Sequence, residues 1–290
     1  EIRAYLFANC TSLTKVIISD TVTRIQEGAF KNCTNLAAII IPDSVLQIYS
    51  DSYANTDSFK GCNNLSSIYF NGSLRLWCTA SSYSYDNSTK IWNASVFPVA
   101  YDLYIDNKKI TELTEESFKN ITSLCDYAFK NCKSIKSVIL PSTITNFGSY
   151  VFEGCSGITT LLVDQVIQDN ISIFDKKYIT NIIFQDDVTS IGKNGNSYTF
   201  SSFPKLTSVT IPSSVTRVGP WAFAGCSALN SIIFEDTITK WCETYETVGY
   251  YQDSESNKPM SKDPTENAKL LKNRGYSNEK YYVSEKYTSD

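Results

Sequence analysis

The chain contains no histidine, and that absence removes several kinds of chemistry. Ser–His and Cys–His catalysis both need an imidazole base, and many metal centres need an imidazole ligand. None of these sites is available to a chain of this composition.

Long apolar runs and an excess of one charge are missing too. No run approaches the roughly 18 residues of a membrane-spanning helix, so no membrane span is expected. The 26 basic and 30 acidic residues give a net charge of −4. That balance provides no basic surface for nucleic acid. The chain opens at Glu1 inside a repeat, without Met or a signal peptide, so we expect a mature or excised fragment.

Carboxylates remain as candidates for chemistry, but their patterns are weak. Glu115-Glu116 and Asp186-Asp187 lie in polar turns, where a solvated surface is the favoured interpretation. Asp51, Asn55 and Asp57 supply oxygen ligands, yet this segment lacks the glycine and the distal glutamate of a calcium loop. We therefore expect no enzyme, no cofactor and no metal site.

What the chain does have is a repeated pair, a phenylalanine followed three residues later by a cysteine. Neighbouring pairs lie 23 residues apart in two parts of the chain. A fixed period of about 20–29 residues is typical of leucine-rich repeats, whose units stack to bury a shared core. In two repeats the pattern changes: Phe203 stands where Cys is expected, and Phe174 lies one residue closer to its strand. The regular pairs are Phe7/Cys10, Phe30/Cys33, Phe59/Cys62, Phe129/Cys132, Phe152/Cys155 and Phe223/Cys226.

Each repeat reads as one coil with three parts. A Leu-x-x-Ile-x-Ile segment alternates apolar residues and predicts a strand. A Ser-Val-Thr-x-Ile segment predicts a second, shorter strand, and Gly148, Gly192 and Gly219 follow it, where we expect turns with φ > 0. The Ala-Phe-x-x-Cys segment predicts a helical turn that carries Phe and Cys inward. The main strands are expected at Leu13–Ile18, Leu36–Ile41, Leu65–Phe70, Tyr104–Leu113, Ile135–Leu140, Ile158–Val163, Ile179–Phe184, Leu206–Ile211 and Leu229–Phe234.

The cysteines admit two interpretations. Six of the nine occupy the repeat position, where cysteine behaves as a small buried hydrophobe, so we expect reduced thiols. Disulfides such as Cys10–Cys33 or Cys132–Cys155 remain the alternative, because adjacent rungs of a sheet lie about 4.8 Å apart. Cys78 and Cys242 each follow a tryptophan and have no adjacent basic residue, which favours packing over a nucleophile.

These repeats resemble the BspA-like leucine-rich repeats of surface proteins from gut and oral bacteria and from trichomonads. The signature is Gly-x-x-Ala-Phe-x-x-Cys-x-x-Leu-x-x-Val-x-Ile-Pro-x-Ser-Val-x-x-Ile, and residues 26–48 and 219–234 follow it well. The resemblance implies an α/β repeat solenoid with one parallel sheet and short 3-10 or helical turns on the other side. It also implies a non-catalytic, extracellular or cell-surface adhesion protein.

A larger repeat suggests how the chain is divided. The segment that ends in Trp77-Cys78 parallels the one that ends in Trp241-Cys242, and an irregular Ser/Tyr/Asn-rich stretch follows each. We expect a repeat block at 1–78, an irregular insert at 79–102, a second block at 103–242 and a polar tail at 243–290. In the tail, residues 263–273 read as a helix, and residues 281–287 as the start of a further block.

Asparagine followed by x-Ser/Thr recurs along the chain. In a eukaryotic secretory protein these would be glycan acceptors, whereas the simpler interpretation is that asparagine suits tight turns. They occur at Asn9, Asn32, Asn64, Asn71, Asn87, Asn93, Asn120 and Asn170.

The residue between the last two apolar positions of each strand should point outward, because side chains alternate along a strand. An exposed apolar stripe would mark a site for a protein partner, on a host or neighbouring cell, or for self-association. The alternatives are a stripe covered by the chain itself or half-buried by curvature, and a structural spacer with no ligand. We call this set the outward column: Ile17, Ile40, Tyr69, Ile139, Leu162, Ile183, Thr210 and Ile233.

Overall fold

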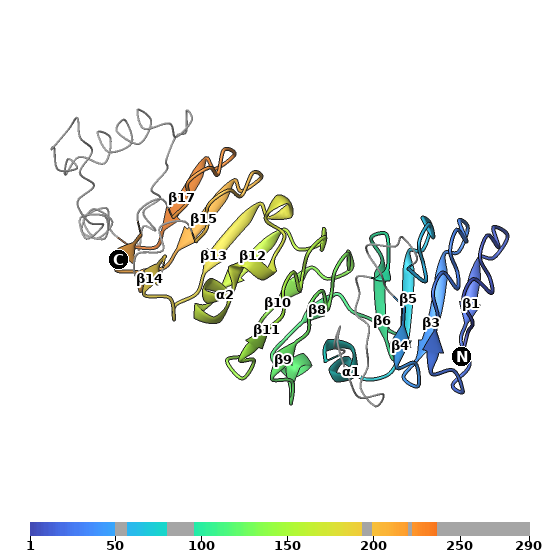
Figure 1. Cartoon of the computed structure of the whole chain (residues 1–290). Coiled ribbons are helices and arrows are strands. Elements are labelled where there is room, and N and C mark those ends of the chain that lie inside the picture. The colour runs from blue at the N-terminus through green and yellow to red at the C-terminus, as the bar shows by residue number, and fades with distance from the viewer. Residues whose placement is uncertain (50–56, 80–95, 193–198, 220–221, 237–290) are drawn as a thin grey trace. The chain divides into compact units, whose positions relative to one another are not determined.

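The computed structural model describes residues 1–49, 57–79, 96–192, 199–219 and 222–236. The tail at 243–290, most of the insert at 79–102 and the loop at 193–197 lie outside these residues. By its internal packing the chain divides into two compact units (Figure 1). The first unit comprises residues 1–158 with 172–175, and the second comprises 159–171 with 176–290.

The first unit is a stack of coils that contributes one strand per coil to a main sheet. The strands pair in parallel from β1 to β6, so the expected parallel pairing of the first two is confirmed. A separate parallel pair, β8 (Glu112–Leu113) with β10 (Ser137–Val138), follows along the chain. The main sheet contains β1 (Lys15–Ile17), β3 (Ala38–Pro42), β5 (Ser67–Asn71), β6 (Asp102–Ile105) and β7 (Lys108–Lys109).

The expected rung at Tyr104–Leu113 is wrong, and the parallel strands of the described residues are divided among several sheets. β6 pairs in the reverse direction with β7, with Ile105 opposite Lys108. The two residues between them, Asp106 and Asn107, have φ of 48° and 61°. Two consecutive positive φ values suit a two-residue hairpin turn, which Asn and Asp tolerate. The hairpin therefore ends the first sheet, and β8 begins another.

The second unit has its own four-stranded parallel sheet. Half-buried and buried residues alternate along every strand, which is the expected strand pattern. The strands are β12 (Thr160–Val163), β13 (Asn181–Phe184), β15 (Ser208–Ile211) and β17 (Ser231–Phe234).

A second line of two-residue strands confirms the shorter extended segment of the repeat. The serine that precedes it has a role in stacking, because Ser44 Oγ donates to the Val22 carbonyl at 3.0 Å. Ser214 Oγ donates to the Val188 carbonyl in the same way, also at 3.0 Å. The parallel pairs are β2 (Arg24–Ile25) with β4 (Gln47–Ile48), β9 (Ser123–Leu124) with β11 (Asn146–Phe147), and β14 (Ser190–Ile191) with β16 (Arg217–Val218).

Helical structure in the described residues is limited to short segments. Ser73 begins α1 (Leu74–Cys78) by accepting from the Leu76 amide, and Asp164 begins α2 (Gln165–Asp169) by accepting from the Ile167 amide. The fold is thus a mostly β solenoid of stacked parallel coils with minor helical turns, as the repeat predicted. The 3-10 turns are η2 (Glu116–Phe118), η3 (Ile171–Ile173) and η4 (Lys176–Tyr178).

Stacked phenylalanine rings form the core on the side of the turns. Phe30 is fully buried between two parallel rings, and Phe174 joins the ladder although its repeat is one residue short. Phe203, which replaces the cysteine of its repeat, is buried too. The ring centroids lie 5.4 Å apart for Phe7–Phe30, 5.3 Å for Phe30–Phe59, 5.3 Å for Phe129–Phe152 and 5.0 Å for Phe152–Phe174.

The Ala-Phe-x-x-Cys segment carries Phe and Cys inward, as predicted, but it is not a helical turn. Consecutive turns form instead, with the Lys31 amide donating to the Gly28 carbonyl at 2.9 Å and Cys33 to Phe30 at 3.1 Å. Gly28 and Asn32 have φ of 57° and 59°. These left-handed residues interrupt the helical backbone on either side of the phenylalanine.

The expected φ > 0 turns hold for Gly192, at 84°, but Gly148 and Gly219 are not among the residues with positive φ. At these two positions the reason for glycine is space. A Cβ on Gly148 would lie 2.3 Å from the Asp126 amide nitrogen, so the neighbouring coil leaves no room for a side chain. On Gly219 the nearest atom would be the Ile191 carbonyl oxygen at 3.2 Å, a milder contact.

The phenylalanine ladder predicts a graded response to truncation. Phe30→Ala should lower the free energy of unfolding by about 3–5 kcal/mol, because it leaves a cavity between two rings. Phe7→Ala should cost clearly less, because Phe7 is 38% exposed and contacts a ring on one side only. Urea unfolding of both variants measures the difference. Equal losses would contradict the ladder as the source of stability.

Candidate binding face

The structure aligns most of the outward column by strand register. In the first unit Ile17 pairs with Ile40, and Ile40 with Tyr69. Ile139 lies in the same unit, directly after β10 of the smaller sheet. The second unit aligns the remaining four across its sheet: Leu162, Ile183, Thr210 and Ile233.

The column points away from the core, so the predicted register is right. Its residues are flanked by fully buried ones, such as Ile39 and Ile41 beside Ile40. They are not bare, however. Ile17 is 69% exposed on the edge strand β1, whereas the other members of the column are half-buried. Side chains on adjacent strands, about 4.8 Å apart, shield one another from water.

The column in the second unit is uncharged. Two residues before each column member, the same face carries Thr160, Asn181, Ser208 and Ser231. These side chains are half-buried as well. The described face of this sheet therefore presents aliphatic groups beside hydroxyl and amide groups, without an ionised side chain on its four strands.

In the first unit the column ends in an aromatic pair that the sequence interpretation missed. Tyr104 pairs in register with Tyr69, and their rings stack with centroids 4.3 Å apart. Lys109 Nζ lies 2.9 Å from Asp102 Oδ2 and 6.0 Å from the centroid of the Tyr104 ring. The hydrogen bond to Asp102 raises the pKa of Lys109. The alternation Leu-Tyr-Ile in β6, which matches Ile-Tyr-Phe in β5, is the signal that could have found Tyr104.

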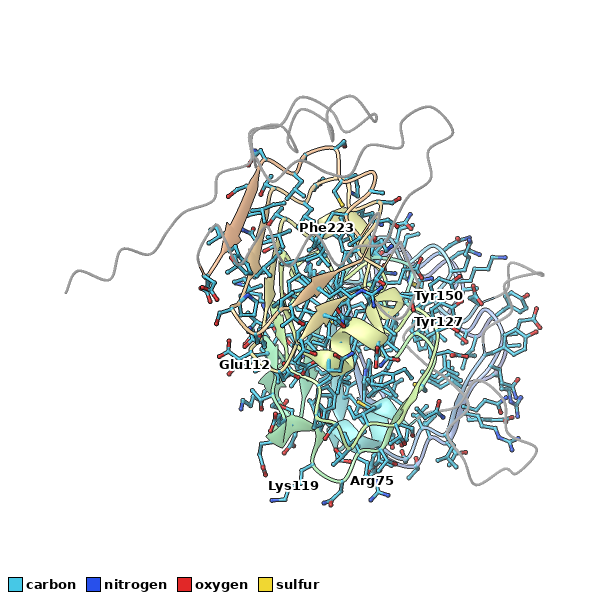
Figure 2. All side chains as sticks on the ribbon, turned by 90° about the vertical axis from the view of Figure 1, so that its left-hand side faces the viewer. Arg75, Glu112, Lys119, Tyr127, Tyr150 and Phe223 are labelled. Atoms are coloured by element: carbon cyan, nitrogen blue, oxygen red, sulfur yellow. The ribbon has the colours of Figure 1, made fainter. Side chains whose placement is uncertain are left out.

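A second aromatic pair lies on the turns, as Figure 2 shows for the half-buried Tyr127 and the exposed Tyr150. Their ring centroids lie 5.4 Å apart, and Lys130 Nζ lies 4.8 Å from the Tyr127 centroid and 3.1 Å from Glu153 Oε2. Both tyrosines have φ of 57°, a strained value for a bulky residue. They occupy the position that Gly28 holds in its own coil.

Apart from these surfaces, the described residues contain few groups that are arranged for catalysis or metal binding. Within the described ranges no group of three or more His, Cys, Asp or Glu is arranged to hold a metal ion. Glu115, Glu116, Asp186 and Asp187 are all exposed, in turns, as expected. Asp51 and Asn55, which were considered above as calcium ligands and not favoured, lie outside the described residues. None of the described helices is long and apolar enough to cross a membrane.

The asparagines of three Asn-x-Ser/Thr motifs confirm the turn interpretation. Asn9, Asn32 and Asn120 have φ of 61°, 59° and 63°, values that asparagine tolerates better than most residues. Asn32 Nδ2 also donates to Asn9 Oδ1 at 3.1 Å, so the two side chains link neighbouring coils.

The cysteines of the repeat do more than fill space. Burial of this position is confirmed for every described member except Cys10, which is exposed on the first coil, and each described cysteine stands outside any disulfide. In four coils the thiol donates to the carbonyl of the phenylalanine one coil earlier. The pairs are Cys33 to Phe7 at 3.0 Å, Cys62 to Phe30 at 3.0 Å, Cys155 to Phe129 at 3.0 Å and Cys226 to Phe200 at 3.2 Å.

Burial also keeps these thiols protonated. It raises the pKa of Cys62 to about 12 and that of Cys132 to about 11. A thiol with so high a pKa remains a donor and a poor nucleophile at neutral pH. The repeat cysteines are therefore structural. Cys242, which follows Trp241 and was expected to pack, lies outside the described residues.

A family model of the BspA type leucine rich repeat region matches six copies of the repeat, over residues 1–96, 103–195 and 193–245. No curated protein matches the chain.

Solved structures with similar folds include bacterial leucine-rich repeat proteins. One from Bacteroides ovatus is 23% identical with a TM-score of 0.38, and the match covers 80% of this chain and 58% of that one. A leucine-rich cell surface protein from Faecalibacterium prausnitzii is 20% identical (TM-score 0.32), with 84% and 65% covered. The pneumococcal vaccine antigen PcpA is 15% identical (TM-score 0.34), with 94% and 79% covered. The match thus spans less than two thirds of the first two proteins' own lengths.

The buried thiols predict a pH dependence of stability. An unfolded cysteine ionises near pH 8.5, whereas folded Cys62 holds its proton until about pH 12. The stabilisation is therefore complete below about pH 8.5 and is lost as the pH rises towards 12. Between pH 8.5 and 11 the free energy of unfolding should fall less steeply in Cys62→Ala than in the wild type.

Urea unfolding across this range measures both slopes, and Cys10→Ala, which removes an exposed thiol, is the control. Parallel curves for the wild type and Cys62→Ala would contradict the assignment.

Proposed function

The chain belongs to the BspA-type leucine-rich repeat proteins, and on that premise we propose that it is a non-catalytic protein-binding module of a cell-surface adhesion protein. Its partner would be a protein on a host or neighbouring cell, or a second copy of this chain. The ligand site would be the outward column on the four-stranded sheet of the second unit, with a second contact region on the main sheet of the first unit.

The alignment of the outward column in the second unit carries the proposal. Leu162, Ile183, Thr210 and Ile233 lie in register on four parallel strands, with hydroxyl and amide side chains beside them. Such a face loses its remaining water on contact, and apolar burial contributes roughly 25 cal/mol per Å². The absence of ionised side chains on these strands also suits the centre of a protein interface, where charged residues are depleted.

The aromatic pair supports a second contact region in the first unit. Tyr69 and Tyr104 are stacked and half-buried, so they are already ordered before a partner arrives. Tyrosine is enriched among the residues that dominate interface energetics. Lys109 and Asp102 beside them would supply the polar rim.

One observation favours the alternative of a structural spacer without a ligand. Most of the column is half-buried by its own neighbours, so the sheet tolerates water without a partner. A spacer needs only the stacked coils, and its face could be changed without any functional loss.

Charge placed in the column separates the two functions. Ile183→Asp with Thr210→Asp puts two carboxylates in the middle of the face of the second unit, and should reduce adhesion at least tenfold if this face binds. The matched control is Ser213→Asp with Ser227→Asp, which adds the same charge at exposed turn positions of the same unit.

Beads coated with each variant would be counted on epithelial cells and on bacterial cells, with circular dichroism to verify folding. Undiminished adhesion of the column variant, or an equal loss in the control, would reject this face as the site. If neither the wild type nor either variant binds to the cells, the spacer function is favoured.

A further inference from the structure

We propose that Cys78 and Cys125 are a disulfide-forming pair, oxidised by a small-molecule disulfide such as oxidised glutathione. The pair lies in the first unit and is separate from the binding face. It is also separate from the cysteine ladder, because neither residue occupies the Phe-x-x-Cys position of a repeat.

Backbone geometry brings the two residues together. The Cys125 amide donates to the Cys78 carbonyl, with 2.8 Å between nitrogen and oxygen. With standard bond lengths that contact limits the Cα–Cα distance to about 6.7 Å. Disulfides need a separation of about 4.4–6.8 Å, so the backbone satisfies this requirement without rearrangement.

The side chains share one environment. Cys78 is fully buried and Cys125 half-buried. Burial raises the pKa of Cys125 to about 12 and holds that of Cys78 well above its usual range, and repulsion between the two thiolates raises the pKa of Cys78 further.

The ladder cysteines are held differently. Cys33, Cys62 and Cys155 each direct the thiol hydrogen to a phenylalanine carbonyl one coil earlier. Oxidation of two ladder cysteines would break such bonds and leave each carbonyl with the amide hydrogen bond of its own turn, as for Phe30, which also accepts from the Cys33 amide. The structure thus separates one oxidisable pair from a set of structural thiols, and composition alone could not make that distinction.

The position of the pair suggests what the bond would do. Cys78 ends α1, whose Trp77 donates through Nε1 to the Ala128 carbonyl at 2.7 Å. Cys125 immediately follows β9. The contact therefore connects the coils before and after the hairpin of β6 and β7, where the main sheet of the first unit ends (Figure 1). A bond here would add a covalent link to coils that are otherwise paired through the isolated bridge between Tyr101 and Cys132.

The chemistry balances as two thiol–disulfide exchanges. The thiolate of Cys125, the more accessible residue, attacks one sulfur of the oxidised reagent and releases one reagent thiolate, which takes up a proton. The thiolate of Cys78 then attacks Cys125 Sγ in the mixed disulfide and releases the second reagent thiol. Two protein thiols are oxidised to one disulfide, and one small-molecule disulfide is reduced to two thiols. The high pKa values make this slow in the folded protein, so it should proceed during folding.

The test is to refold the whole chain in a buffer of reduced and oxidised glutathione, and then to alkylate it under denaturing conditions. Intact mass should show alkylation at two fewer sites than the nine cysteines, and digestion should yield one cross-linked peptide that contains Cys78 and Cys125. Alkylation at all nine cysteines, or a cross-link between any other pair, would overturn the proposal.

Two further measurements test the proposal, so that a variant that fails to fold does not leave it untested. Reduction of the wild type should lower Tm by about 5–10 °C, because the bond closes a long loop. Cys125→Ser should be alkylated at every remaining cysteine and should show no change in Tm on reduction, whereas the ladder variant Cys155→Ser should still form the bond. An unchanged Tm in the reduced wild type would contradict the proposed bond.

Discussion

The turns of each coil close with hydrogen bonds of their own, but many other backbone groups find their partners on the neighbouring coil. The Phe30 amide donates to the Ser58 carbonyl at 2.9 Å, and the Asn32 amide to the Lys60 carbonyl at 2.7 Å. Side chains add to these bonds, as Cys62 does for the Phe30 carbonyl. A single coil would leave these groups unpaired and its phenylalanine exposed, so the coils are stable only as a stack.

Stacking in register also determines how the surface residues are arranged. Because every coil must present the same backbone groups at the same height, equivalent residues form columns that run across the strands. One column of each main strand faces the core and the next faces outward. The proposed binding face would therefore be set by the residues of one outward column. This explains how Ile40, Tyr69 and Thr210 can occupy equivalent positions.

The parts of the fold that follow from this constraint could be predicted from the sequence. The period located the strands and the phenylalanine ladder, and the alternation of side chains predicted which residues of the strands face outward. The parts set by local backbone geometry could not be. The hairpin depends on positive φ at Asp106 and Asn107, and Gly148 is needed because a neighbouring coil lies close. The thiol–carbonyl bonds were missed because cysteine was treated as a hydrophobe, although its fixed position was a signal for such a partner.

Hydrogen–deuterium exchange at the amides of Phe30 and Asn32 tests the dependence of each coil on the next most directly. Both amides have their partners on the following coil, and Lys31 between them has its partner within its own turn. We expect Phe30 and Asn32 to exchange slowly and together, through cooperative opening of the stack. Exchange of these two amides at the rate of exposed turn amides, with Lys31 as protected as they are, would contradict it.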